Sequence, residues 1–346
     1  MVVQQLFAAG EKRDKSVLRS ARHSKIGLTK SRVFHLEFAN RVMKKLMLTI
    51  LATWICLSAA SGNDLPARTI RVAAVSFVPQ QYHLQDNANQ LEKMFRLAAE
   101  GGAKIAVAPE GALDGYVINE IIAGKIKEER IKEVAITLDS PVMKRFKALA
   151  RELKMCLVFG LAERMGDDVF NCAVFLDDQG TICGKYHKMQ FSEGYHPSWW
   201  FNRLGKQSRA FATPYGRCGI MICNDRWNAQ LAKIPALDGA QFLVIPSYGS
   251  KSQAQDEAVL NRGRENNLPV IEANVGVTLI VDNNEIVAMD RENEGVTFAE
   301  MTIPPSKPID TQQRDRVEQA FLQWRKHEMQ RRYKETRRRN QEKKSP

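Results

Sequence analysis

The chain has 346 residues, of which 44% are hydrophobic and 26% are charged, as is typical of a folded globular protein. Its formal net charge of +12 is unevenly spread: residues 1–60 carry 11 basic and 3 acidic side chains, residues 313–346 carry 12 and 5, and residues 61–312 carry 28 and 31. The body of the chain is therefore mildly acidic, which argues against a nucleic-acid-binding domain.

Residues 1–60 are predicted to form a leader. Residues 1–42 are polar and basic, and Lys44-Lys45 then precede an apolar run over 46–57 and the small residues 58–60. A positive start, an apolar run and a small-x-small site are the three parts of a secretory signal peptide. We expect cleavage after Ala60, and an uncleaved membrane anchor is the alternative.

The apolar run is shorter than the roughly 20 residues that span a bilayer, so we expect no membrane span in the mature chain. Met43 is a better candidate for the initiator methionine than Met1. Residues 1–42 are then either an over-extension of the predicted gene or an unusually long leader. If 43–60 works as a signal peptide, the protein is exported, that is, periplasmic or secreted; otherwise it is cytoplasmic.

The body spans 61–312 and begins with alternating strands and helices. A mostly apolar strand is followed by a helix that Gly101-Gly102 end, and the next strand ends in Pro109-Glu110. Ser140-Pro141 begin another helix. The elements predicted in this half are strands over 70–76, 104–108, 155–160 and 171–176 and helices around 88–98 and 141–153.

The second half of the body contains hairpins as well as strand–helix alternation. Turn residues over 177–180, 214–216 and 282–284 each separate two apolar runs. Helices are predicted over 231–237 and 256–267, and strands over 241–245 and 270–273. This alternation predicts a mixed α/β body with helices covering both faces.

The last segment, 313–346, is predicted to be a basic helix or tail. Val317, Ala320, Phe321 and Trp324 recur at helical spacing, so we expect this face to dock on the body or on a partner subunit. Beyond Trp324 the segment is almost wholly charged, which predicts either a solvated helix or a patch for an anionic surface. It lacks base-reading motifs, so we expect no specific nucleic-acid partner.

Three residues end apolar, strand-like runs: Glu110, Lys188 and Cys223. Catalytic groups of α/β proteins collect at such ends. A strand that delivers a thiol to a sharp turn presents a nucleophile, although a lone buried cysteine is more often inert. The six cysteines form no CxxC pair and the six histidines show no zinc-ligand spacing, so we expect no metal.

Five blocks in order resemble those of the nitrilase, or carbon–nitrogen hydrolase, superfamily. They extend from about residue 70 to about residue 303 and include a Pro-Glu block, a lysine block and a cysteine block. The blocks are 106–110, 184–188, 219–225, 239–246, and 262–266 with Asn274.

The chain departs from the family pattern at three places. His187 replaces an arginine, Gln190 stands where members often have histidine, and Asn228-Ala229 stand where many have Pro-Glu. The last two departures bear on substrate class rather than on the triad. The stretch 223–227 is similar to that of N-carbamoyl-D-amino-acid hydrolases, without their additional arginine and Pro-Glu.

The resemblance implies a Glu110–Lys188–Cys223 triad that cleaves a non-peptide carbon–nitrogen bond through a thioester. Cys223 supplies the thiolate, Glu110 carries protons, and Lys188 with the backbone N–H of Asn224 stabilises the oxyanion. Glu193 is the expected second glutamate that orients water or substrate. Arg226 is expected to grip a substrate carboxylate.

The implied fold is an α-β-β-α sandwich: two mixed sheets face to face with helices outside, associating as homodimers or higher oligomers. The expected substrate is a small amide or an N-carbamoyl compound, and no cofactor is implied. Nitrile hydrolysis by the same triad is an alternative, and a catalytically silent binding or scaffold protein is another.

Overall fold

The structure is a computed structural model that describes residues 67–342. The predicted leader, 1–60, and the last four residues, 343–346, lie outside the described residues. Among the described residues, no helix combines the length and the apolar character needed to cross a membrane.

The first sheet has six strands in the order β12-β1-β2-β3-β4-β5. β1, β2 and β3 run parallel, whereas β12, β4 and β5 pair antiparallel with their neighbours, so the sheet is mixed. Its strands are β1 (Arg68–Ser76), β2 (Ile105–Val107), β3 (Cys156–Met165), β4 (Asp168–Leu176), β5 (Ile182–His187) and β12 (Gly295–Ile303).

The second sheet repeats this plan in the order β11-β10-β9-β8-β7-β6. β7, β8 and β9 run parallel, and the outer strands pair antiparallel. Its strands are β6 (Phe211–Thr213), β7 (Gly216–Ile220), β8 (Phe242–Ser247), β9 (Val270–Asn274), β10 (Val277–Asp282) and β11 (Glu285–Asp290).

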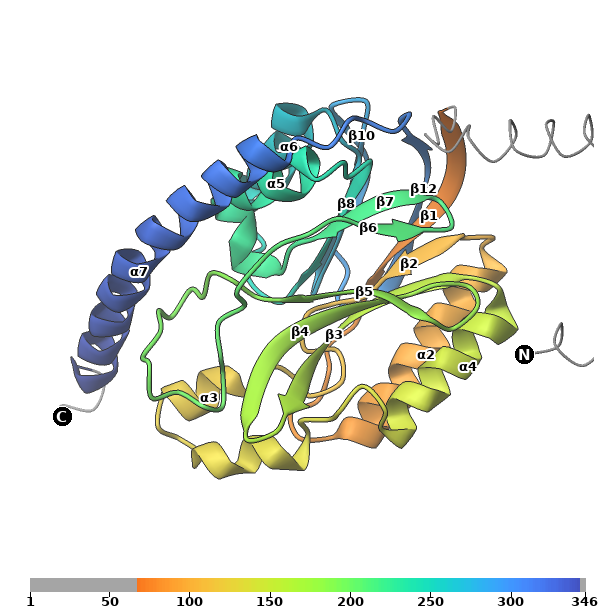
Figure 1. Ribbon diagram of the computed structural model, residues 1–346. Coiled ribbons are helices and arrows are strands. Elements are labelled where there is room, and N and C mark those ends of the chain that lie inside the picture. The colour runs from red at the N-terminus through yellow and green to blue at the C-terminus, as the bar shows by residue number, and fades with distance from the viewer. Residues whose placement is uncertain (1–66, 343–346) are drawn as a thin grey trace, which may run out of the picture. The chain divides into compact units, whose positions relative to one another are not determined.

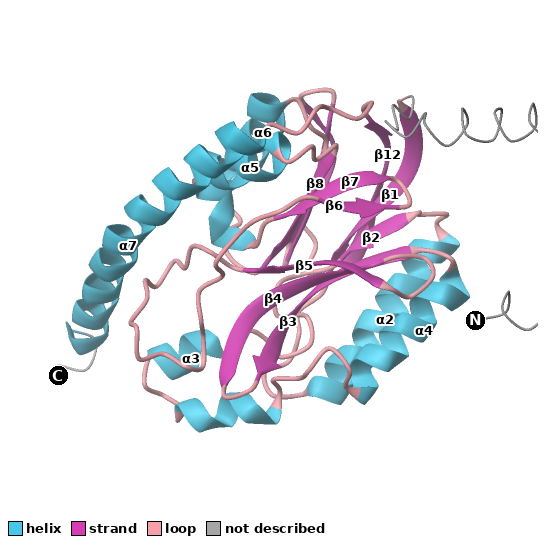
Figure 2. Cartoon of the chain, viewed as in Figure 1, coloured by secondary structure: helices cyan, strands magenta, loops and turns pink. Residues whose placement is uncertain are grey.

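Helices cover the outer faces of both sheets (Figures 1 and 2). α2 (Leu84–Glu100) and α4 (Pro141–Leu153) pack on the first sheet, and α5 (Ala229–Leu237) and α6 (Gln253–Asn266) pack on the second. The predicted α-β-β-α sandwich is confirmed. Short helices lie in the connections: α3 (Ile118–Ile122), η1 (Glu128–Glu133) and η2 (Cys223–Trp227).

Apolar side chains between the two sheets form one continuous core. Val158 and Phe175 of the first sheet and Phe242 and Ile271 of the second belong to it, and all four are fully buried. Burial of each such side chain stabilises the fold by about 1.5–3 kcal/mol. Because the inner faces are closed in this way, polar groups collect where the strands end, and the candidate site lies there.

Strand β12 was not predicted from the sequence. Seven of its nine residues are half-buried or exposed, so it lacks the apolar signature of the inner strands. It pairs with β1 along the full length of both strands, from Arg68–Ile303 to Ser76–Gly295. Backbone pairing therefore forms this edge strand with little help from a hydrophobic pattern.

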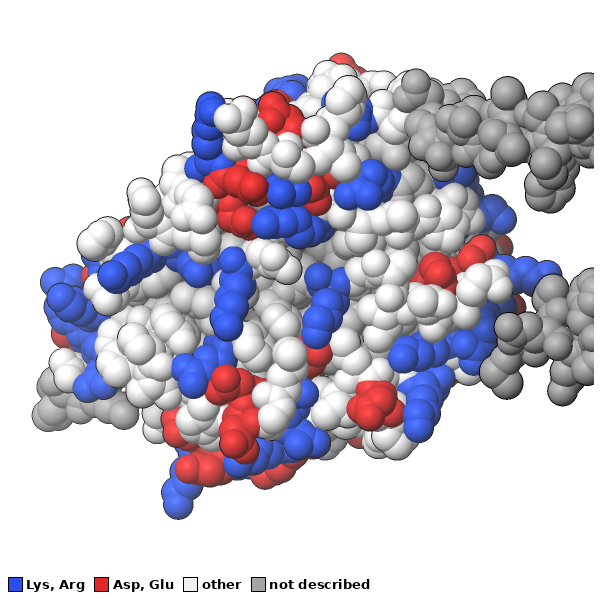
Figure 3. All heavy atoms as spheres, in the orientation of Figure 1, with Lys and Arg blue, Asp and Glu red and all other residues white. Residues whose placement is uncertain are grey.

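The C-terminal segment forms the long helix α7 (Thr311–Glu342). Phe321 is buried and Val317 packs against the core, as predicted, but the prediction is wrong for Ala320 and Trp324, which are exposed. Polar contacts rotate the helix: Glu318 accepts from Arg209, and Arg325 Nη1 donates to the Gly205 carbonyl at 2.6 Å. Basic side chains gather at the lower end of α7 (Figure 3).

Candidate active site

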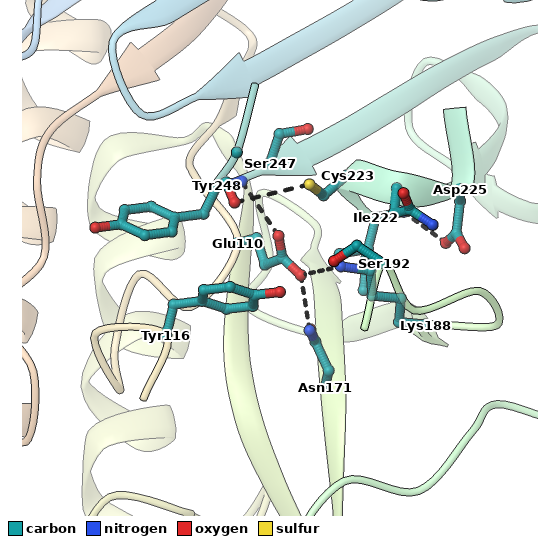
Figure 4. A network of polar contacts seen from close by, with 12 residues as sticks. Glu110, Tyr116, Asn171, Lys188, Ser192, Ile222, Cys223, Asp225, Ser247 and Tyr248 are labelled. Carbon is teal, nitrogen blue, oxygen red and sulfur yellow. Dashed lines mark hydrogen bonds and ion pairs between the residues drawn. The ribbon is translucent and has the colours of Figure 1, made fainter. Parts of the chain in front are cut away.

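Glu110 lies three residues after β2 and is fully buried. Its Oε1 accepts hydrogen bonds from Lys188 Nζ at 2.6 Å and from Asn171 Nδ2 at 2.7 Å. Its Oε2 accepts from the backbone N–H of Tyr248 at 3.1 Å. Three donors from three separate segments therefore fix the carboxylate in one orientation (Figure 4).

Glycine is required next to Glu110. A Cβ at Gly160, on β3, would lie 2.6 Å from both the Glu110 Cα and the Gly111 nitrogen, and both are backbone atoms that cannot give way. The backbone of β3 therefore approaches the glutamate more closely than any side chain would permit.

Lys188 follows directly after β5 and is also buried, with its ammonium 5.6 Å from the centre of the Tyr116 ring. Burial is the largest single influence and lowers the pKa of the ammonium, but the neighbouring acidic groups, of which Glu110 contributes most, together outweigh burial. The pKa of Lys188 therefore lies well above its ordinary value, and the group is a permanent cation.

Cys223 begins η2 at the end of the β7 segment, in the left-handed conformation with φ +45°. This region is unfavourable for a residue with a Cβ, so the surrounding structure holds the thiol on a strained turn. Burial and the charge of Glu110 raise the pKa of Cys223, while Lys188 and Arg226 lower it. The net shift is upward, so the resting group at neutral pH is a thiol.

Residues 248 and 249 close the site over the sulfur. The backbone of Tyr248 contacts two site residues: its N–H donates to Glu110, and its carbonyl oxygen lies 3.8 Å from the Cys223 Sγ. A Cβ at Gly249 would lie 3.2 Å from the same sulfur, so the glycine leaves space there.

Asp225 holds the turn that carries the thiol. Its carboxylate accepts from the backbone N–H groups of Ile222 and Gln190 and from the hydroxyl of Tyr186, at 2.9–3.0 Å. Burial raises the pKa of Asp225 to about 6. The Asp225 carboxylate thus ties the end of the β7 segment to the segment after Lys188, which fixes the position of the Cys223 thiol relative to the Lys188 ammonium.

Arg226 lies behind the sulfur with 1% of its surface exposed. Its Nη2 lies 3.4 Å from the Cys223 Sγ, and its Nη1 donates to the carboxylate of Glu272, on β9. Glu272 is fully buried and also accepts from Ser247 Oγ at 2.9 Å and Gln255 Nε2 at 2.8 Å. A second buried ion pair therefore adjoins the thiol of Cys223.

The remaining predicted residues lie close by. Asn224 directly follows Cys223; its Nδ2 donates to the Gln190 carbonyl, and its own carbonyl accepts from Gln190 Nε2, both at 3.3 Å. Glu193 is 8% exposed, accepts from Ser192 Oγ at 2.7 Å, and contributes to the raised pKa of Lys188. Every predicted site residue therefore belongs to one neighbourhood.

One group of potential metal ligands occurs among residues 67–342, outside this neighbourhood. Ligand atoms of Glu163, Cys172 and His187 lie within 4.8 Å of one another. However, Glu163 is already engaged by Lys185 Nζ at 2.7 Å and by His187 Nε2 at 2.5 Å. An ion would have to displace one of these partners, so we assign no metal to the group.

Three site residues were missed from the sequence: Asn171, Tyr248 and Glu272. Glu272 left a signal, because a single acidic residue interrupts the apolar strand run Val270-Ile271-Glu272-Ala273. A charged side chain on a buried strand needs a buried partner of opposite charge, and in the structure Arg226 is that partner. Asn171 and Tyr248 left no signal, because strand pairing and loop path place them.

A family model described as carbon–nitrogen hydrolase matches residues 71–305. A citrullinase from Francisella tularensis is 28% identical over 243 residues, which cover 62% of this chain and 82% of that protein. An N-carbamoylputrescine amidase from Solanum tuberosum is 27% identical over 237 residues, covering 67% and 77%.

Solved structures of an amidase from Nesterenkonia sp. AN1 share the fold. One of them, a complex with butyramide, superposes with a TM-score of 0.57 at 19% identity and covers 67% of this chain and 90% of that one. At this identity the likeness concerns the fold alone.

Proposed function

The chain belongs to the carbon–nitrogen hydrolase family, and on that premise we propose that it hydrolyses a small amide or N-carbamoyl compound through a thioester on Cys223. The observation that carries the proposal is the sharing of partners at the site. Glu110 accepts from Lys188 and from the Tyr248 peptide, and the carbonyl of Tyr248 faces the Cys223 sulfur.

In the first half-reaction, the Cys223 sulfur attacks the substrate carbonyl carbon while its proton passes to Glu110. A C–S bond forms, and the carbonyl π electrons move to oxygen. Lys188 Nζ and the N–H of Asn224 stabilise this oxyanion. When the carbonyl re-forms, the C–N bond breaks and Glu110 returns the proton to the departing nitrogen, which leaves as ammonia or an amine.

In the second half-reaction, Glu110 takes a proton from water, which attacks the thioester carbon. The C–S bond breaks and the proton returns to sulfur, so the thiol is regenerated. An amide yields a carboxylic acid. An N-carbamoyl compound yields a carbamic acid, which breaks down to carbon dioxide and the second nitrogen product: ammonia where the amine left first, and the amine where ammonia left first. Glu193, close to Lys188, is the proposed group that orients this water.

The names of the relatives favour a carbamoyl substrate. Citrulline and N-carbamoylputrescine both carry a carbamoyl group on an amine nitrogen. Nitrile hydrolysis by the same residues is the second candidate, because matching relatives also include plant nitrilases.

Ammonia release from a panel of amides, ureas and nitriles tests the proposal. We expect turnover with at least one amide or urea and none with Cys223→Ala, which removes the nucleophile and little buried volume. Cys218→Ala is the matched control, because Cys218 is buried on β7, just before the turn, and neither Glu110 nor Lys188 is among the charges that act on its thiol. A Cys223→Ala protein as active as the parent would favour the catalytically silent binding protein instead.

We further propose a homodimer or higher oligomer that uses the outward face of α7, where Trp324 is 40% exposed. Sedimentation of the parent and of Trp324→Glu tests it, and identical masses would contradict it.

Export through the segment 43–60 is also proposed, and N-terminal sequencing of the mature protein should then begin at residue 61.

A further inference from the structure

We propose that the buried Arg226–Glu272 pair excludes substrates that carry a carboxylate next to the scissile group and admits uncharged or cationic ones. The inference rests on the proposed function and specifies its substrate class. It replaces the expectation that Arg226 grips a substrate carboxylate.

The guanidinium of Arg226 lies close enough to the sulfur to contact a bound substrate. Its Nη2 is 3.4 Å from the Cys223 Sγ. A substrate whose carbonyl carbon meets this sulfur therefore brings its nearest substituents beside Arg226. The net charge of that wall decides which substituents are tolerated.

Glu272 cancels the charge of Arg226. The two side chains are in direct contact and expose 1% and 0% of their surface, so water screens their interaction little. Nη1 also faces Ser247 Oγ at 3.3 Å. A substrate carboxylate at this wall would meet a neutral pair whose negative member is already fixed.

Glu272 cannot swing away to release Arg226. Its second oxygen accepts from Gln255 Nε2 at 2.8 Å, and Gln255 Oε1 in turn accepts from Asn274 Nδ2 at 3.0 Å. These side chains are buried on α6 and β9. The pair is therefore a preformed part of the wall.

The charges around the nucleophile point the same way. Two buried cations, Lys188 and Arg226, face four buried carboxylates: Glu110, Glu193, Asp225 and Glu272. Arg226 Nε is buried and has no hydrogen-bond partner among the described residues. That single N–H suits a neutral carbonyl or hydroxyl oxygen, whereas a carboxylate would add to an existing excess of negative charge.

Three ureas of similar size test the inference: N-propylurea, N-(2-aminoethyl)urea and N-carbamoylglycine, which are neutral, cationic and anionic. We expect the full-length protein to release ammonia from the neutral or the cationic urea with a kcat/KM at least tenfold above that for the anionic one. Glu272→Gln keeps the shape and frees the charge of Arg226, so it should raise the anionic-to-neutral ratio at least tenfold.

Two variants control for indirect effects. Arg226→Gln/Glu272→Gln removes both charges and should not gain activity on N-carbamoylglycine. Glu318→Gln removes a buried carboxylate on α7 that pairs with Arg209 rather than with Arg226, so it should leave the anionic-to-neutral ratio unchanged. An unchanged ratio in folded Glu272→Gln would overturn the inference, as would a parent that prefers the anionic urea.

A binding measurement on the parent protein tests the inference even if the Glu272→Gln variant does not fold or the protein hydrolyses none of these ureas. Propionamide and propionate are compared as protectants of Cys223 against iodoacetamide in the parent protein, with alkylation followed by mass spectrometry. We expect protection by propionamide at concentrations at least tenfold lower than by propionate. Equal protection overturns the inference, whereas absence of ammonia release from every compound counts against the proposed function alone.

Discussion

Two buried ion pairs flank Cys223, and they differ in what surrounds the carboxylate. In the Glu110–Lys188 pair, the carboxylate also accepts from the Asn171 amide and from a backbone N–H. Its negative charge raises the pKa of the Cys223 thiol without a direct hydrogen bond. In the Arg226–Glu272 pair, the cation contacts the sulfur and the carboxylate lies behind it. In the first arrangement a carboxylate acts on the thiol, whereas in the second an N–H donor whose positive charge is neutralised contacts the sulfur.

Neither pair is explained by stability alone. Replacing a buried ion pair with apolar groups is often neutral or stabilising, whereas removing one partner costs about 3–5 kcal/mol. Two such pairs beside one thiol are therefore better explained by chemistry in the first case and substrate choice in the second. Breaking each pair separately should give different results.

Breaking the first pair should have the largest effect. Lys188→Met keeps the length of the side chain but removes the ammonium, so the oxyanion loses a charged donor and Glu110 is left unpaired. We expect kcat to fall by about a thousandfold, and the free energy of unfolding by about 3–5 kcal/mol. Steady-state ammonia release and urea denaturation measure the two effects.

Lys185→Met is the control for this change. Lys185 lies on β5, just before Lys188, pairs with Glu163 and is 36% exposed, so its loss should change kcat less than about threefold. A folded Lys188→Met protein within tenfold of the parent would remove Lys188 from the proposed mechanism.

Filling the space between the pairs should have an intermediate effect. A Cβ at Gly249 would lie 3.2 Å from the Cys223 Sγ and 3.9 Å from Arg226 Nη2. We expect Gly249→Ala to lower kcat/KM by about thirtyfold to a hundredfold, because the methyl group occupies the place of the acyl group. The backbone at 249 is not left-handed, so the melting temperature should change by less than about 2 °C.

Ser250→Ala alters the exposed neighbour and should leave kcat/KM almost unchanged. If Gly249→Ala and Ser250→Ala have equal activity, the acyl group does not bind between the sulfur and Arg226. The Arg226–Glu272 pair would then not be part of the substrate wall.

The two pairs also show what the sequence could predict. Glu110, Lys188 and Cys223 stand in motif blocks at strand ends, with Arg226 directly after the third block, and parallel strands bring such ends to one edge of a sheet. The alternating strands and helices likewise predicted the sandwich. The partner of Arg226 lies 46 positions further along the chain. The pairing of β7 with β8 and of β8 with β9 brings Glu272 to the turn that carries Arg226, and spacing in the sequence does not report strand pairing.

Helix α7 illustrates a second limit. The apolar stripe at 317, 320, 321 and 324 predicted which side docks, but ion pairs decide the rotation. Glu318 is buried against Arg209, and Arg325 reaches the carbonyls of Met189 and Gly205, beside the segment that carries Lys188. A hydrophobic pattern cannot report a docking surface whose strongest contacts are polar.

A buried carboxyl without a cation should behave unlike either pair. Asp114 is 3% exposed, forms no ion pair among residues 67–342, and accepts from the backbone N–H of Tyr116 at 3.0 Å. Burial raises the pKa of Asp114 to about 6 from its ordinary 3.8. The folded state therefore holds this proton more tightly than the unfolded state does.

Because the folded pKa is the higher one, the stability that Asp114 contributes is fully present below about pH 4 and is lost as the pH rises to about 6. The shift corresponds to about 3 kcal/mol, of which we expect about 1–2 kcal/mol after relaxation of the site. Asp114→Asn should remove this part of the pH dependence between pH 4 and 7 in urea denaturation, whereas the exposed Asp167→Asn should not. If the pH profile of Asp114→Asn equals that of the parent, this interior tolerates a carboxylate anion without a neighbouring cation. Burial would then not explain why Lys188 lies beside Glu110 and Arg226 beside Glu272.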